Sequence, residues 1–233
     1  MNTALLDREL NSVWLDTALK LACTQLPLVR MRDELYGTLK ATSLGEEALI
    51  KTTTALTRIW LVPTANGAEH IIWALEYADK STDWRPLHLG AMLAGEPFIA
   101  ALLEACGREH RAKGEIDTIA LRERMRNIYG PKRGIDRATQ RGVKTLRSLG
   151  ILEGLPQTSI SRSGCVVVTD PTLAAWLVRC LLLGRKAESI AVDDLRHAPE
   201  LFGIALPAIL PRSAPGISRH VEGVGRTVLA LNY

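Results

Sequence analysis

The stretch that decides the fold spans residues 117–152 and is DTIALRERMRNIYGPKRGIDRATQRGVKTLRSLGIL. Apolar residues recur at three- and four-residue steps in both of its halves, which predicts one helix over 118–129 and a second over 137–149. The segment between them, GPKRG at 130–134, combines helix breakers with charge and predicts a turn. The stretch therefore predicts two short helices joined by a tight connection.

Capping residues define the ends of these helices, and β-prone residues follow them. Asp117 and Asp136 precede the two helices and are good N-caps, and Gly150 can end the second helix in a left-handed conformation. Ile151-Leu152 can then begin a strand. After a polar stretch, residues 165–169 (CVVVT) are strongly β-prone and predict a second strand.

Helix, turn, helix, strand, polar loop and strand is the order found in winged helix-turn-helix proteins, and residues 117–169 resemble them. The segment TLRSLGIL at 145–152 is similar to the exit of a winged-helix recognition helix into its strand. In this resemblance the tip of the wing is the segment 159–164 (SISRSG), whose hydroxyls and one Arg suit phosphate or minor-groove contact.

The second helix has two chemically different faces. Its apolar face, predicted to pack on the preceding helices, consists of Ile135, Ala138, Val143, Leu146 and Leu149. Its outer face consists of Arg137, Gln140, Arg141, Lys144 and Ser148. A recognition helix presents such a face to the major groove, where Arg pairs with guanine, Gln pairs with adenine and Lys contacts phosphates. The predicted DNA-contacting residues are Lys132, Arg133, Arg137, Thr139, Gln140, Arg141, Lys144, Arg147 and Arg162.

The excess positive charge of the chain is concentrated around this helix. The chain has 233 residues, a net charge of +4 and an isoelectric point near 9.0. Residues 108–147 contain twelve Lys or Arg and five Asp or Glu, so this window carries +7 and the remainder −3. A local cationic excess favours a polyanionic partner, and we expect double-stranded DNA. A solvated basic helix, or a winged helix that binds only protein, remains an alternative at this stage.

The N-terminal half predicts a helical bundle. Amphipathic segments with short links are expected at 3–24, 27–41, 43–62, 68–79, 87–94 and 98–111. Ser43 is expected to cap the third of these, and Pro63 to stop it. The predicted fold class is mainly α: an N-terminal helical bundle followed by a winged helix-turn-helix with small β-hairpins. The predicted domains are 1–113, the bundle; 114–170, the winged helix-turn-helix; and 171–233, a C-terminal helix with a β-hairpin extension.

The C-terminal third predicts a helix over 171–184, a short helix over 189–197 and a β-hairpin over 217–231. Four prolines keep the chain between 199 and 216 irregular. These elements could form a second, degenerate winged unit. Its basic surface would consist of Arg212, Arg219, His220 and Arg226.

No pattern in the chain predicts catalysis. The five His have no metal-ligand spacing, and neither a phosphate-binding glycine loop nor a GxSxG elbow occurs. Four widely spaced Cys are expected to be reduced and mostly buried. Asp7, Arg8 and Glu9 interrupt any signal peptide, and no apolar run approaches the roughly 20 residues of a membrane span. We expect a cytoplasmic protein that is not an enzyme and has no cofactor, metal or membrane contact.

A helical N-terminal half (3–112) followed by the basic segment RATQRGVKTLRSLGIL (137–152) resembles the BrxA-like accessory proteins of BREX phage-defence systems. This resemblance implies a DNA-binding subunit of a defence assembly without its own catalysis, whose helical part contacts protein partners or a second copy of the chain. Two alternatives stay open: a winged-helix transcriptional regulator whose N-terminal part dimerises or senses a ligand, and a scaffold that binds only protein.

Overall fold

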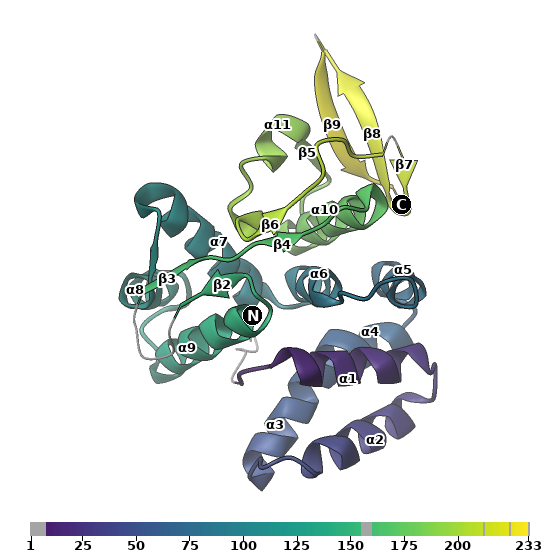
Figure 1. Cartoon of the computed structure of the whole chain (residues 1–233), viewed down its shortest axis with the longest axis vertical. Coiled ribbons are helices and arrows are strands. Elements are labelled where there is room, and N and C mark those ends of the chain that lie inside the picture. The colour runs from purple at the N-terminus through teal and green to yellow at the C-terminus, as the bar shows by residue number, and fades with distance from the viewer. Residues whose placement is uncertain (1–7, 155–159, 212, 224, 233) are drawn as a thin grey trace.

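The computed structural model describes residues 8–154, 160–211, 213–223 and 225–232. It is mainly helical with small sheets, as predicted. Figure 1 shows three groups of elements: the first helices at the bottom, α7 to α9 at the left, and a C-terminal hairpin at the top. Buried apolar side chains from all three groups form one continuous core.

The N-terminal half contains the predicted succession of helices. They are α1 (Ser12–Cys23), α2 (Leu28–Lys40), α3 (Glu46–Leu56), α4 (Val62–Ala65), α5 (Glu69–Ala78) and α6 (Arg85–Gly95). Two details of the prediction are wrong. Gly45, not Ser43, is the N-cap of α3, so this helix has no side-chain capping hydrogen bond. Pro63 does not stop the helix: a wider π-turn at Thr57–Leu61 leads directly into α4. Pro63 lies in the first turn of α4, where the N–H that proline lacks is not needed for a hydrogen bond within the helix.

Helix α10 (Pro171–Arg185) packs against α6 in the middle of the molecule. Asp170 caps it by accepting from the backbone N–H groups of Thr172 and Leu173, and every residue from 173 to 182 is buried. The two helices approach closely because Gly90 has no side chain: a Cβ there would lie 2.2 Å from Cζ3 of Trp176.

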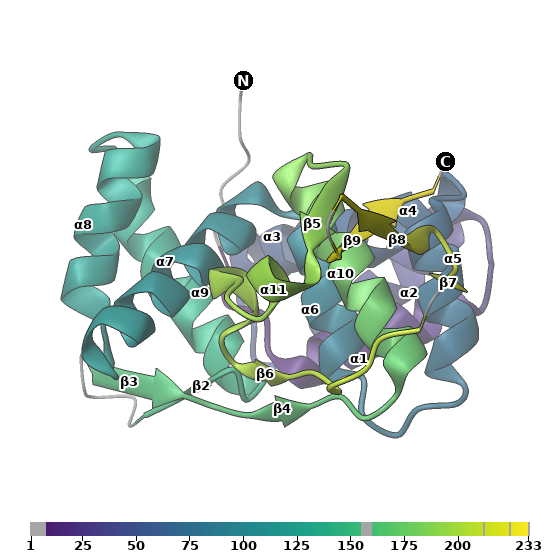
Figure 2. The ribbon, with the colours of Figure 1, turned by 90° about the horizontal axis from the view of Figure 1, so that it is seen from above.

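The middle of the chain folds as three helices and three short strands, with the first strand between the first two helices. The elements are α7 (Pro97–Lys113), β1 (Ile116–Asp117), α8 (Thr118–Tyr129), α9 (Arg133–Ser148), β2 (Leu152–Glu153) and β3 (Ile160–Ser163). The three strands form an antiparallel sheet in the order β1-β3-β2. Figure 2 shows β2 and β3 beside each other at the end of the three helices. We call this group, residues 97–163, the first unit.

The predicted caps of this unit are confirmed in part. Asp117 accepts a hydrogen bond from the backbone N–H of Ile119, as an N-cap does. Gly150 has a φ of +70°, the left-handed conformation predicted for it. Asp136 is not a cap, because α9 begins at Arg133, one turn earlier than predicted, and the Asp136 carboxylate instead pairs with Arg126 of α8.

The prediction that 165–169 is the second strand of the wing is wrong. The strand that returns beside β2 is β3, which occupies most of the expected tip at 159–164; Ser159 lies outside the described residues. Residues 165–169 contain β4 (Val166–Val167), which pairs in parallel with β6 (Ile204–Ala205). A β-prone sequence favours a strand but does not select its partner.

The C-terminal part forms a second sheet beside α10. Its elements are β5 (Ser189–Ala191), α11 (Val192–Leu195), the 3-10 helix η2 (Pro199–Leu201), β7 (Ser213–Ala214), β8 (Ile217–Glu222) and β9 (Arg226–Leu231). The sheet order is β5-β9-β8-β7, and the predicted hairpin is confirmed. The helix predicted at 189–197 is shorter, since its first three residues pair with β9 as a strand. We call residues 171–232 the second unit.

Within the described part of the chain, no single helix has both the length and the apolar character to cross a membrane. Helices α6 and α7 meet these criteria only as a pair bent by 111°.

Candidate nucleic-acid interface

Helix α9 is fixed on α7 and α8 by its buried stripe. Ile135 and Leu146 are at most 1% exposed, as predicted. The helix lies directly on α7, because a Cβ at Gly142 would be only 2.4 Å from Cδ2 of Leu102. Thr139 belongs to this stripe: it is fully buried, and its hydroxyl donates to the carbonyl of Ile135 at 2.8 Å. The prediction that Thr139 contacts DNA is therefore wrong.

The opposite face of α9 presents cations and an amide. Arg137, Gln140 and Lys144 are exposed, and Arg141 between them is half-buried. Three- and four-residue steps place these four side chains on one face, since neighbours on a helix recur at that spacing. The structure thus brings together the central part of the predicted site.

At the start of α9, Lys132 is exposed and forms the N-cap position, without a side-chain capping bond. Arg133 is the first helical residue, and its side chain is outside the described atoms. Both follow the turn that separates α8 from α9. They extend the row of predicted site positions by one turn toward the N-terminus of the helix.

At the other end of α9, Arg147 connects the helix to the sheet. Its Nη2 donates to Oγ of the buried Ser161 on β3 at 2.7 Å. Arg147 is half-buried, so it orients the helix against the strand rather than projecting freely. Arg162, the next residue on β3, points to the other side of the strand and is exposed, opposite Glu153 of β2.

An ion pair fixes the turn between α8 and α9. Nε of Arg126 donates to the carboxylate of Asp136 at 2.7 Å, and Nη2 donates to its second oxygen. The hydrogen bond from Arg126 holds the pKa of the Asp136 carboxyl below its ordinary value. This pair neutralises the one carboxylate that α9 itself contributes.

The N-terminal segment borders the outer face, a feature that the sequence did not predict. The backbone N–H of Leu10 donates to Thr145 Oγ1 at 2.9 Å, and that of Ser12 donates to Ser148 Oγ at 2.7 Å. Ser148, predicted to be on the outer face, is thus a contact to this segment. Nζ of Lys144 lies 3.4 Å from a carboxylate oxygen of Glu9. No local pattern signals contacts between residues more than 130 positions apart.

The second predicted basic surface is not assembled as expected. Arg226 pairs with Asp194 at 3.3 Å, and His220 shares a hydrogen bond with the hydroxyl of Ser218. Arg219 faces a cavity described below, and Arg212 lies outside the described residues. These side chains do not form a row comparable to that of α9.

Other titratable groups are parts of the core. Burial lowers the pKa of His88, although its Nε2 lies 2.7 Å from an oxygen of Asp16. Burial also raises the pKa of the Cys106 and Cys180 thiols. In the described ranges, no three His, Cys, Asp or Glu side chains are grouped as a metal site requires.

Comparisons with protein-family models, with curated proteins and with solved structures find no match to this chain.

Proposed function

We propose that the first unit is a winged helix-turn-helix and that the protein binds double-stranded DNA through α9. The observation that carries the proposal is the exposed row of Arg137, Gln140 and Lys144 on a helix whose other side is fully packed. The sheet order β1-β3-β2 supports it, because a hairpin directly after a recognition helix is the geometry of a wing.

The dimensions of α9 suit the major groove. Its 16 residues extend over about 24 Å at ~1.5 Å per residue, and a groove roughly 12 Å wide admits one helix. Arg137 and Gln140 are suited to base edges, and Lys144 to a phosphate. Lys132 and Arg162 flank the helix at its start and on the sheet, where they would contact the backbones on either side.

The same proposal gives the chain no catalytic role of its own. On the resemblance to BREX accessory proteins, we propose that it acts as a DNA-binding subunit of a defence assembly, with α1 to α6 contacting other subunits or a second copy. Such a subunit binds many sequences with modest affinity. A transcriptional regulator, the alternative, prefers one palindromic site by a factor of about 10³ or more.

A salt titration of DNA binding tests the proposal. Affinities for a random duplex and for a genomic duplex library are measured between about 50 and 200 mM salt. Three to five phosphate contacts predict a slope of log K against log salt between about −3 and −5, since each contact contributes roughly −0.9. Similar affinity for all duplexes supports the accessory subunit. A scaffold that binds only protein gives no salt-dependent binding, which contradicts the proposal.

A further inference from the structure

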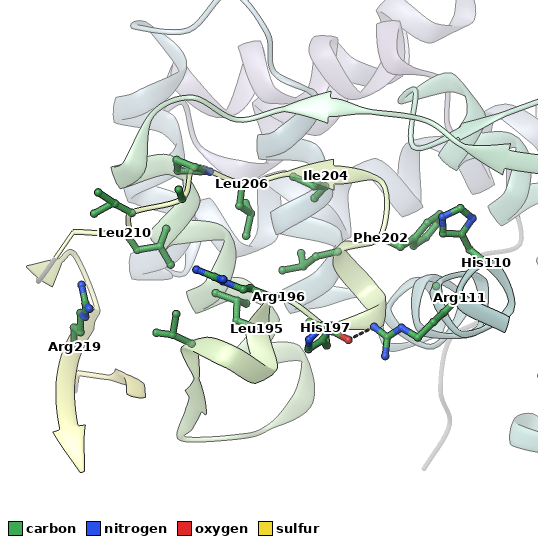
Figure 3. Close-up of a pocket in the computed structure, with 17 residues that line it drawn as sticks. His110, Arg111, Leu195, Arg196, His197, Phe202, Ile204, Leu206, Leu210 and Arg219 are labelled. Carbon is green, nitrogen blue, oxygen red and sulfur yellow. Dashed lines mark hydrogen bonds between the residues drawn. The ribbon is translucent and has the colours of Figure 1, made fainter. Parts of the chain in front are cut away.

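A cavity lies between the two units, lined by residues of α7 and of the second unit. It has a volume of about 920 Å³ and opens to solvent between α7, α11 and the extended chain that precedes β7. Figure 3 shows His110 and Arg111 on one side, Arg219 on the other, and Arg196 reaching across the middle. Of the residues that line it, the sequence analysis assigned a role only to Arg219, as part of the second basic surface.

The cavity lies beside α11, where the second unit has no long helix like α9. In the first unit, the 16-residue α9 fills the space between helices and sheet with its apolar stripe. At the corresponding place the second unit has only the three-residue η2 and then an extended chain through Pro207 and Pro211. Proline prevents a helix from forming there, and the space beside α11 remains unfilled.

The cavity wall combines apolar side chains with basic ones. Its apolar part includes Leu195, Phe202, Leu206 and Leu210. Its polar part is cationic or basic, with Arg111, Arg196, His197 and Arg219. None of the described lining residues is acidic.

The cations of the wall differ in what they already contact. Arg111 donates to the carbonyl of His197, which fixes it at the edge. In the described ranges no carboxylate lies within ion-pair distance of Arg196 or Arg219. Two guanidinium groups beside an apolar wall are therefore available to an anion, and guanidinium is the cation best suited to carboxylate and phosphate geometry.

We propose that this cavity binds an organic anion with an apolar body, its acidic group held by the guanidinium of Arg196 and its body against the leucine wall. The volume lies within the range of small-molecule sites, about 300–1,000 Å³. Ile209 at the rim, 75% exposed, would be covered by such a ligand. This proposal rests on the cavity and is independent of DNA binding.

Two fluorescent probes of nearly equal shape test it. Anilinonaphthalene sulfonate carries an anionic group on an apolar body, and N-phenylnaphthylamine is the same body without the charge. With the full-length chain we expect one saturable site for the anionic probe, displaced by decanoate and not by decanol. Arg196→Gln should raise the Kd of the anionic probe about tenfold and change that of the neutral probe less than twofold.

Two further variants separate the cavity from other surfaces. Arg30→Gln removes an exposed Arg from α2, far from the cavity in sequence and fold, and should change neither probe. Leu206→Trp fills the cavity and should reduce binding of both probes. The proposal is overturned if the anionic probe does not saturate at one site, or if Arg196→Gln and Arg30→Gln bind it equally.

Discussion

The first and second units share part of their order of elements and differ most clearly in one helix. Each begins with a long helix, α7 or α10, followed by a short strand, a second helix and finally a hairpin. In each, the first strand pairs with the last, giving β1-β3-β2 in one and β5-β9-β8-β7 in the other, where β7 is an additional edge strand. The third helix is present in the first unit as α9 and absent from the second.

This difference teaches that the shared order of elements does not by itself make a nucleic-acid surface. In the first unit, α9 packs one stripe and presents Arg137, Gln140 and Lys144 to solvent. In the second, the chain at that position is extended, a cavity remains, and Arg226 of the hairpin is paired with an acid. The two units are therefore expected to respond differently to the same kinds of substitution.

The largest effect is expected where α9 is packed. Leu146 is fully buried, so Leu146→Ala removes buried methyl groups and leaves a cavity in the first unit. We expect a loss of about 2–5 kcal/mol in the free energy of unfolding, measured by denaturant unfolding. Ile128→Ala on α8, where the side chain is 52% exposed, is the control and should cost much less. Equal losses would mean that α9 is rotated from the described position.

A smaller loss of stability is expected where α6 contacts α10, the helix that begins the second unit. Gly90→Ala places a Cβ against Trp176 of α10, and overpacking of this kind costs about 1–3 kcal/mol. Gly37→Ala in α2 meets nothing within 4 Å and should instead stabilise by about 0.5–1 kcal/mol. Thermal unfolding of both variants checks this pair. A stabilising Gly90→Ala would show that α6 and α10 are not in close contact.

Acid should weaken the attachment of the second unit through His70. Burial, and then the charge of Arg179 on α10, lower the pKa of His70 from 6.5 to about 4. A lowered histidine pKa favours the folded state above pH 6.5, and this contribution is lost as the pH falls toward 4. His70→Gln should therefore flatten the stability profile between pH 6.5 and 4 relative to the wild type, measured by urea unfolding at several pH values. An unchanged profile would contradict the lowered pKa of His70.

The smallest effect is expected from the hairpin of the second unit. Arg219→Ala with Arg226→Ala removes two positive charges, but these side chains form no row on a packed helix. The ion pair of Arg226 with Asp194 is exposed, so its loss should cost less than about 1 kcal/mol. DNA affinity should change less than about twofold, measured by fluorescence anisotropy. A loss of DNA affinity similar to that of the α9 variants would mean that the hairpin does form a second DNA-binding surface.

Local patterns predicted much of the first unit. The apolar periodicity located α8 and α9, and Asp117 and Gly150 marked helix ends because capping depends on residues close in sequence. Thr139 could also have been placed correctly. It lies four residues after Ile135, so it belongs to the buried stripe, where its hydroxyl is satisfied by the helix itself.

The remaining features depend on contacts between distant segments. β1 has two residues, too few for a detectable alternation, and exists because it pairs with β3, whereas β2 begins where the sequence predicted a strand. The contact of Leu10 with Thr145 and the cavity beside α11 likewise follow from tertiary packing. No local pattern in the sequence distinguishes such segments from ordinary loops.

The most direct test of the central claim compares two double variants that each remove one Arg and one Lys. Arg137→Ala with Lys144→Ala changes the outer face of α9, whereas Arg30→Ala with Lys40→Ala changes exposed positions of α2. DNA affinity is measured at several salt concentrations, with thermal unfolding as the folding check. We predict that the α9 variant binds about 10- to 100-fold more weakly, with its salt slope reduced by about 1–2, and that the α2 variant binds as the wild type does. Equal affinity of the two variants would contradict the assignment of α9 as the DNA-binding helix.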